Sequence, residues 1–233
     1  MGKGLIQSYE ERMNKRDENE RKIICFLKTE IYTTAKILAE LLDFKGVSSV
    51  YSILKRMEKN GLLLKKEIIL DGVKDFSLYG ITSHGALLAL DENEDPFKIL
   101  TFQPSKIAIN TLQHRLDIQK IRVSAEKMGF EWKALHNVKS ESKSKLPDAL
   151  LKVNGVVFPV EVERVAKSPK RYKEIAERYQ KHLSERGWGG VLYLFPNEQL
   201  KNRVVRIFQA VLVDESINRF EFKTYDEFLG GGL

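Results

Sequence analysis

The sequence has little cysteine: Cys25 is the only one in 233 residues. A single thiol excludes a disulfide framework and a zinc site built from several thiolates. Because Cys25 lies in the apolar run "IICFL", we expect a small buried hydrophobic side chain rather than a reactive thiol.

Long apolar runs are also missing. No stretch approaches the roughly 18 apolar residues that cross a bilayer. The start, "MGKGLIQSYEERMNKR", lacks the apolar region of a signal peptide, and its sixth residue is Ile6 where a myristoylation signal has Ser or Thr. We therefore expect a cytoplasmic protein in a reducing compartment, without a membrane partner.

Positive charge is what the sequence has in excess. Lys and Arg number 39 against 32 Asp and Glu, which gives a formal net charge of +7. Such a balance favours a polyanionic partner, nucleic acid first, although a solubilising surface charge explains it equally well. Hydrophobic content of 42% beside 30% charged residues is typical of a globular protein with a real core.

The first part of the chain has the pattern of three helices followed by a hairpin. Apolar residues recur at helical spacing in residues 12–27 and 47–57, and residues 33–42 fit a short helix between them. Two strand-like runs then flank Asp71-Gly72, a strong hairpin signal. This order resembles a winged helix-turn-helix, which reads the major groove with its third helix and contacts phosphates with its wing. The expected DNA-binding residues are Ser48, Ser49, Tyr51, Ser52 and Lys55 on that helix, with Lys65, Lys66 and Lys74 on the wing. A winged helix that contacts protein is the alternative.

An acidic break, "DENEDPF" (residues 91–97), predicts the boundary between a first domain, residues 1–96, and a second, residues 97–233. Beyond it the chain reads as a long helix from Ser105, a short strand, a hairpin, a basic helix capped by Ser168, a buried strand, a helix and a last strand. The expected fold class is therefore α/β, with a mixed sheet in the second domain.

The hairpin "KLPDALLKVNGVVFPVEVER" groups three acids. With Asn154-Gly155 as a two-residue turn, Val153 pairs with Val156, and every pair of positions sums to 309. Asp148 then lies opposite Glu161, with Cβ atoms roughly 4.5–5.5 Å apart, and Glu163 lies on the same face. Uncompensated carboxylates at that distance cost stability.

A divalent cation with oxygen ligands, Mg²⁺ or Mn²⁺, resolves this repulsion. The alternative is a solvated acidic edge of a surface hairpin. A basic helix entrance follows the acids and favours a phosphodiester substrate, because a metal would activate water while cations hold the backbone. The cations are Lys167, Lys170, Arg171 and Lys173.

Pro147-Asp148 followed by Glu161-Val162-Glu163 resembles the motif of the PD-(D/E)xK restriction-endonuclease-like nucleases, and the flanking helices match the αβββαβ core of that fold. With "QHRLDIQKIR" ahead of "PDA…VEVER" and a winged helix before both, the chain resembles the replication-relaxation or MobC-type plasmid relaxases. The resemblance implies a metal-dependent DNA endonuclease, a relaxase that nicks a plasmid or mobile-element origin of transfer during conjugative mobilization.

The resemblance also implies roles for residues. Asp148 and Glu161 would be the main ligands of Mg²⁺ or Mn²⁺, assisted by Glu163, which stands where the family motif has Lys. Either Glu163 is a third metal-facing acid, or the site binds DNA and has lost cleavage. Lys170 or Arg171 would steady the scissile phosphate.

Three further side chains have two interpretations each. His114 shares the helix face of Ile107, Ile118 and Ile121, so it is either a core histidine or a metal ligand or acid–base group. Tyr172 and Tyr179 lie seven apart on one helix face, where they either pack or contact phosphate, or else serve as covalent nucleophiles.

The implied partners are double-stranded origin DNA, single-stranded DNA after nicking, an accessory mobilization or coupling protein, and a second copy of the chain, since winged helices often dimerise. Other functions stay open: a non-catalytic replication initiator or regulator with a degenerate nuclease domain, a restriction- or resolvase-type endonuclease, and an adaptor whose basic surface binds an acidic protein.

Overall fold

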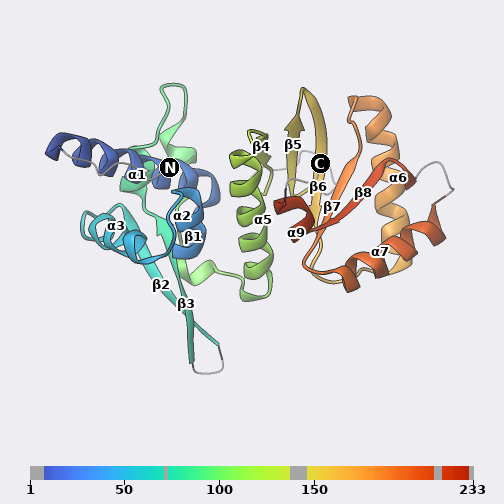
Figure 1. Ribbon diagram of the computed structural model, residues 1–233, viewed down its shortest axis with the longest axis horizontal. Coiled ribbons are helices and arrows are strands. Elements are labelled where there is room, and N and C mark those ends of the chain that lie inside the picture. Colours follow the sequence, from blue (N-terminus) through green and yellow to red (C-terminus); the bar gives the residue numbers. More distant parts are fainter. Residues whose placement is uncertain (1–7, 71–72, 137–145, 213–216, 231–233) are drawn as a thin grey trace. The chain divides into compact units, whose positions relative to one another are not determined.

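The computed structural model describes residues 8–70, 73–136, 146–212 and 217–230 (Figure 1). The chain divides into two compact units, Met1–Ile109 and Asn110–Leu233. The domain boundary predicted between residues 96 and 97 lies 13 residues before this division, which falls between Ile109 and Asn110.

Three helices form much of the first unit. α1 (Tyr9–Glu30) begins at a capping box, in which the Ser8 hydroxyl accepts from the Glu11 N–H and the Glu11 carboxylate accepts from the Ser8 N–H. α2 (Ala35–Leu41) is capped by Thr34, and α3 (Ser48–Lys59) ends before Gly61, whose φ of 71° suits glycine. Helical spacing of apolar residues builds the core, which includes Ile23, Leu27, Leu38, Val50, Leu54 and Met57.

The sheet of the first unit has the strand order β1-β3-β2 and is antiparallel. The long hairpin is β2 (Leu63–Leu70) with β3 (Val73–Ile81), and its register shifts between Ile68 and Ile69. The predicted Asp71-Gly72 turn lies outside the described residues. α4 (Ser83–Leu87), capped by Thr82, and two 3-10 turns (Pro96–Lys98 and Pro104–Lys106) complete the unit.

The expectation that Cys25 is buried is wrong, because the side chain is exposed on α1. At 100° per residue, Cys25 lies about 200° around the helix from both Ile23 and Leu27. Those two residues face the core, so the thiol faces outward. An apolar run on an amphipathic helix therefore does not bury every member.

The second unit is built on a mixed five-stranded sheet with the order β4-β5-β6-β7-β8, which confirms the predicted mixed sheet. β4 to β6 are antiparallel, and β6 to β8 are parallel. Between α5 and β7 the order of elements is αβββαβ. The strands are β4 (Glu131–Ala134), β5 (Ala149–Val153), β6 (Val156–Val162), β7 (Val191–Phe195) and β8 (Phe220–Thr224).

Helices cover both faces of this sheet (Figure 1). α5 (Ile109–Lys127) and the short α9 (Tyr225–Leu229) lie on one face, and α6 (Pro169–Arg186) and α7 (Glu198–Val211) on the other. β7 lies between these layers, and all its residues are buried, as expected of a central parallel strand.

α5 is shorter than the sequence suggested. Pro104 opens a separate 3-10 turn, and α5 starts only at Ile109. Ile107 therefore precedes the helix on which His114 lies, whereas Ile118 and Ile121 are buried on it.

Candidate active site at the end of the β5–β6 hairpin

The hairpin has the register that the sequence predicts. Val153 pairs with Val156, and the ladder runs to Ala149 opposite Val160. At the turn, Asn154 and Gly155 have φ values of 49° and 84°, as a two-residue turn with positive φ at both positions requires. The turn therefore sets which side chains meet at the far end of the hairpin.

Asp148 closes that far end. Its backbone N–H donates to the Val160 carbonyl at 3.0 Å, and its carboxylate Oδ2 accepts from the Val162 N–H at 2.9 Å. The carboxylate thus supplies an acceptor for β6 just where the regular ladder stops. The Asp148 side chain is 13% exposed, and the hydrogen bond from the Val162 N–H holds its carboxylate at the edge of the interior.

His114 reaches the same place from α5. Its Nε2 lies 2.9 Å from the Val162 carbonyl oxygen and 3.4 Å from Asp148 Oδ2. A carbonyl oxygen can only accept, so Nε2 carries the proton. In this arrangement His114 is a donor that positions Asp148 and the end of β6, and its predicted role as metal ligand or acid–base group stays a prediction.

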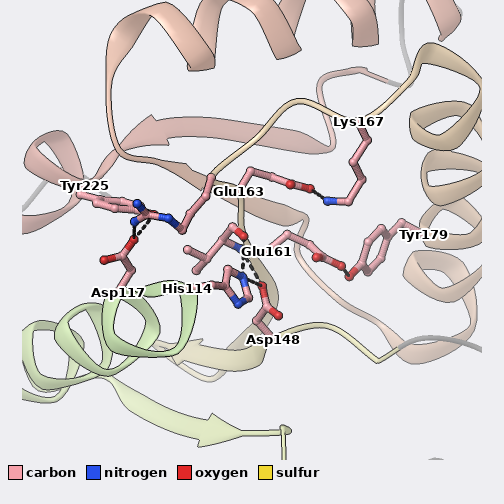
Figure 2. Close-up of polar contacts among 10 residues, drawn as sticks. His114, Asp117, Asp148, Glu161, Glu163, Lys167, Tyr179 and Tyr225 are labelled. Atoms are coloured by element: carbon pink, nitrogen blue, oxygen red, sulfur yellow. Dashed lines mark hydrogen bonds and ion pairs between the residues drawn. The ribbon is translucent and has the colours of Figure 1, made fainter. Parts of the chain in front are cut away.

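Glu161 is held from the opposite layer. It is 3% exposed, and its Oε1 accepts a hydrogen bond from the Tyr179 hydroxyl of α6 at 2.5 Å. Figure 2 shows Asp148 turned toward His114 and Glu161 turned toward Tyr179. Burial raises the pKa of Tyr179, and the negative charges of Glu161 and, more weakly, Asp148 raise it further. Tyr179 thus supplies a hydrogen-bond donor to the buried Glu161 carboxylate.

A second buried hydroxyl lies beside this pair. Tyr193 of β7 is opposite Glu161 in the parallel ladder, and burial together with the Glu161 charge raises the pKa of Tyr193. Its hydroxyl has no hydrogen-bond partner in the described part of the chain. The interior around Glu161 is thus polar, although the rest of the layer is aromatic and aliphatic.

Glu163 has its own cation. It is 4% exposed, and the ammonium group of Lys167 contacts its carboxylate (Figure 2). The Lys167 N–H donates to the Tyr172 hydroxyl at 3.2 Å. Burial raises the pKa of Tyr172 to about 12, although this hydrogen bond acts in the opposite direction. The position where the nuclease motif has Lys therefore holds an acid, and Lys167 brings a positive charge to it.

The other predicted phosphate-holding residues lie farther out. Lys170 and Arg171 are both exposed in the first turn of α6. The Arg171 guanidinium donates to Glu174 at 2.9 Å, so its nearest charge is on its own helix.

Sequence reasoning missed a second polar group next to the site. The Asp117 carboxylate contacts the Arg164 guanidinium and accepts from the Tyr225 hydroxyl at 3.2 Å (Figure 2). Asp117 is three residues after His114, so it lies on a neighbouring helix face, and Arg164 directly follows Glu163. The positions of Asp117 near His114 and of Arg164 next to Glu163 were the sequence signal that could have revealed this group.

In the first unit, the residues expected to contact DNA are accessible. Tyr51 is 50% exposed, and the β2 residues Lys65 and Lys66 are exposed on the hairpin, Lys65 in an ion pair with Glu67 at 3.1 Å. The side chain of Lys74 lies outside the described residues. The remaining predicted residues, Ser48, Ser49, Ser52 and Lys55, are exposed on α3.

Two features are absent from the described residues: a metal-binding cluster and a membrane-spanning helix. No group of three or more His, Cys, Asp or Glu side chains in residues 8–70, 73–136, 146–212 and 217–230 is placed to hold a metal ion. Among the same residues, no helix combines the length and apolar character that crossing a membrane requires. The predicted Mg²⁺ or Mn²⁺ stays a prediction.

The structure defines a mixed α/β protein of two units, with buried acids where the central hairpin of the second unit ends. Residues 25–191 match the family described as replication-relaxation, and the chain belongs to that family. A comparison with curated proteins finds no match.

Proposed function

We propose that this chain binds DNA in plasmid replication and mobilization, and that its second unit nicks one DNA strand with the help of a divalent metal ion. The family description supports the biological setting. The observation that carries the chemistry is the register of the β5–β6 hairpin, which brings Asp148 and Glu161 to the same end, where hydrogen bonds from Val162 and Tyr179 hold the two carboxylates.

The first unit is the proposed site-reading part, a winged helix-turn-helix. Its third helix, α3, exposes polar and basic residues, and the β2–β3 hairpin follows it as a wing with exposed Lys65 and Lys66. Helix side chains in a major groove specify bases, while cations on a wing contact phosphates. The first unit would therefore select the origin sequence.

The second unit is the proposed cutting part, a restriction-endonuclease-like domain of a MobC-type relaxase. Asp148 and Glu161 would hold Mg²⁺ or Mn²⁺, because carboxylate oxygens are the donors that both ions prefer. A bound ion of this kind activates water and stabilises charge on the phosphate. The surrounding residues position the two acids: the His114 and Val162 N–H groups act at Asp148, and the Tyr179 hydroxyl acts at Glu161.

Lys167 takes the part that the motif lysine has in related nucleases. It follows Glu163 by four residues in the connection between β6 and α6, and its ammonium group reaches the buried carboxylate of Glu163. The positive charge therefore stands beside the acids although the motif position itself is Glu. This arrangement supports retained activity.

A nicking assay tests the proposal. Supercoiled plasmid carrying the origin of the encoding element is incubated with the full chain in Mn²⁺, Mg²⁺ or EDTA. We expect open-circular product only with metal, and a loss of about 100-fold or more in Asp148→Asn and Glu161→Gln. Glu131→Gln is the matched control, because Glu131 is an exposed acid on β4 that pairs with Lys152. Absence of product from the unaltered chain, or full product from Asp148→Asn, contradicts the proposal.

A non-cleaving DNA-binding replication protein is the second candidate. It is favoured by Glu163 itself, because the nuclease motif has Lys at that position and here an acid stands there. This candidate predicts salt-sensitive origin binding and no open-circular product with either metal. The same assay separates the two.

A further inference from the structure

A cavity of about 870 Å³ lies between the start of α6 and the outer side of α7. Its polar lining comes from both elements. Lys167 and Ser168 stand at the entrance to α6, and Gln199, Asn202, Arg203 and Arg206 belong to α7.

The α7 residues form one stripe. Positions 199, 202, 203 and 206 follow the spacing i, i+3, i+4, i+7, which places them on a single helix face. The opposite face carries Val204 and Phe208, both fully buried in the core. Because the apolar face of α7 packs on the core, the amide and guanidinium groups on its opposite face point toward the cavity.

The charges in the cavity are of one sign. Lys167, Arg203 and Arg206 line it, and none of the described residues that line it is an acid. Arg203 and Arg206 form no ion pair within the described part of the chain, whereas Lys201 of the same helix is paired with Glu198 and Glu227, each at 2.8 Å. Guanidinium groups that face a concave, polar space are suited to bind phosphate.

The cavity adjoins the acidic site. Lys167 both lines the cavity and contacts Glu163. Arg203 lies near enough to Tyr172 for its charge to act on that hydroxyl, which in turn accepts from the Lys167 N–H. A polyanion bound between α6 and α7 would thus end beside the carboxylates.

We propose that this cavity binds backbone phosphates of one strand of duplex DNA and leads that strand to the end of the β5–β6 hairpin. The assignment rests on the proposed function. None of the lining residues in the described ranges is aromatic, so these residues offer no surface on which a base could stack. The expected contact is therefore with the backbone and independent of sequence.

The test measures binding without chemistry. Fluorescence anisotropy of a labelled random-sequence duplex is recorded with the full chain in EDTA, between 50 and 200 mM salt. In the double variant Arg203→Gln/Arg206→Gln we expect affinity to fall by about tenfold. The slope of log affinity against log salt is expected to shrink by about 1.8 for two lost phosphate contacts.

Two matched variants separate a local contact from net charge. Lys127→Gln/Lys133→Gln removes the same two charges from exposed positions at the end of α5 and on β4, and we expect its salt slope to stay near that of the unaltered chain. Arg203→Lys/Arg206→Lys keeps both charges, and we expect it to keep the slope. Thermal unfolding of each variant checks that the fold is intact. A glutamine variant that binds as the Lys127/Lys133 control does would overturn the assignment.

A free ligand is the other source of phosphate. Calorimetric titration with inorganic phosphate and with dAMP should show no binding at micromolar concentration. Micromolar binding that is lost in Arg203→Gln/Arg206→Gln would assign the cavity to a small phosphate compound. It would overturn the proposal that a DNA strand binds there.

The outcomes also separate this inference from the nicking proposal. Asp148→Asn should lose nicking and keep the salt slope of the unaltered chain. If the unaltered chain never nicks but the salt slope shrinks in Arg203→Gln/Arg206→Gln, only the proposed chemistry is contradicted. If the chain nicks with metal but Arg203→Gln/Arg206→Gln and Lys127→Gln/Lys133→Gln have equal salt slopes, only the assignment of the cavity is contradicted.

Discussion

The Tyr179 hydroxyl and the Glu161 carboxylate are 2.5 Å apart, and both residues are almost fully buried. A carboxylate removed from water needs hydrogen-bond donors, because its desolvation otherwise costs several kcal/mol. Since Tyr179 comes from α6 and Glu161 from β6, this bond orients the proposed metal ligand from a helix that is separate from its own strand.

Removal of that hydroxyl is the first prediction. In Tyr179→Phe the ring still fills its place in the core, but Glu161 loses one donor. We expect the free energy of unfolding to fall by about 1.5–3 kcal/mol, the usual contribution of a hydrogen bond to a charged group, measured by urea denaturation. Nicking should fall as well, while DNA affinity in EDTA stays the same.

Tyr9→Phe is the control for this change. Tyr9 is 71% exposed, so the same chemical deletion there should alter stability by no more than about 0.5 kcal/mol. Equal stabilities of the two variants would show that the Tyr179 hydroxyl does not hold Glu161.

The ion pair between Glu163 and Lys167 gives the second prediction. Lys167→Met leaves a buried carboxylate without this cation. Because the Lys167 side chain is 29% exposed, we expect the free energy of unfolding to fall by about 1–3 kcal/mol, less than for a fully buried pair. The double variant Glu163→Gln/Lys167→Met should recover part of that loss, and the double-mutant cycle measures the coupling.

A pair of the same sequence spacing provides the comparison. Lys181 and Glu185 are also four residues apart, but they are 3.9 Å apart and 72% and 51% exposed. The equivalent cycle with Lys181→Met and Glu185→Gln should give a coupling near zero. Similar couplings in the two cycles would remove the distinction between the buried and the exposed pair.

Local signals in the sequence explain which parts of the site could be predicted. Asn154-Gly155 determines a two-residue turn, the turn determines the register, and the register determines that Asp148 and Glu161 come to one end of the hairpin. Ser168 followed by Pro169 likewise marks the start of α6, because serine caps the first turn and proline lacks an N–H that a helix start does not need.

The partners of the acids could not be predicted in the same way. Tyr179 reaches Glu161 only because β7 pairs with β6 and α6 crosses back over that face of the sheet, which is a tertiary arrangement. The three-residue β1 carries too short a pattern to identify. By contrast, α9 had a readable signal, since Thr224 and Glu227 form a capping box.

Gly80 in β3 gives the third prediction, in the first unit. A Cβ atom at Gly80 would lie 2.0 Å from Cγ of Phe102, which is buried against Tyr32 with ring centroids 5.6 Å apart. Gly80→Ala must displace that ring, so we expect a loss of about 1–3 kcal/mol in the free energy of unfolding. Denaturation of the full chain measures it.

Gly46→Ala tests whether the steric contact is the cause. A Cβ atom at Gly46 would meet nothing within 4 Å, and we expect a change of no more than about 0.5 kcal/mol. The double variant Gly80→Ala/Phe102→Ala should be less destabilised than the sum of the single variants. Additive losses would contradict the proposed clash.

The fourth prediction concerns the tyrosines of the second unit in alkaline solution. Burial raises the pKa of Tyr172 to about 12, and burial also raises the pKa values of Tyr179, Tyr193 and Tyr225. In the unfolded chain these hydroxyls lose their protons near pH 10. Between pH 10 and 12 the unfolded state therefore binds fewer protons than the folded state, and the free energy of unfolding falls as the pH rises. Below pH 10 both states are protonated, and this contribution to the pH dependence disappears.

Absorbance at 295 nm measures the ionisation directly. We expect at least half of the signal of the eight tyrosines to appear only when the circular dichroism of the folded chain is lost. Tyr172→Phe removes one delayed group, so the fall in stability between pH 10 and 12 should become shallower, while Tyr9→Phe should leave it unchanged. Complete ionisation near pH 10 with native circular dichroism would mean that water reaches these hydroxyls, and that Glu161 does not lie in the dry interior on which its hydrogen bond with Tyr179 depends.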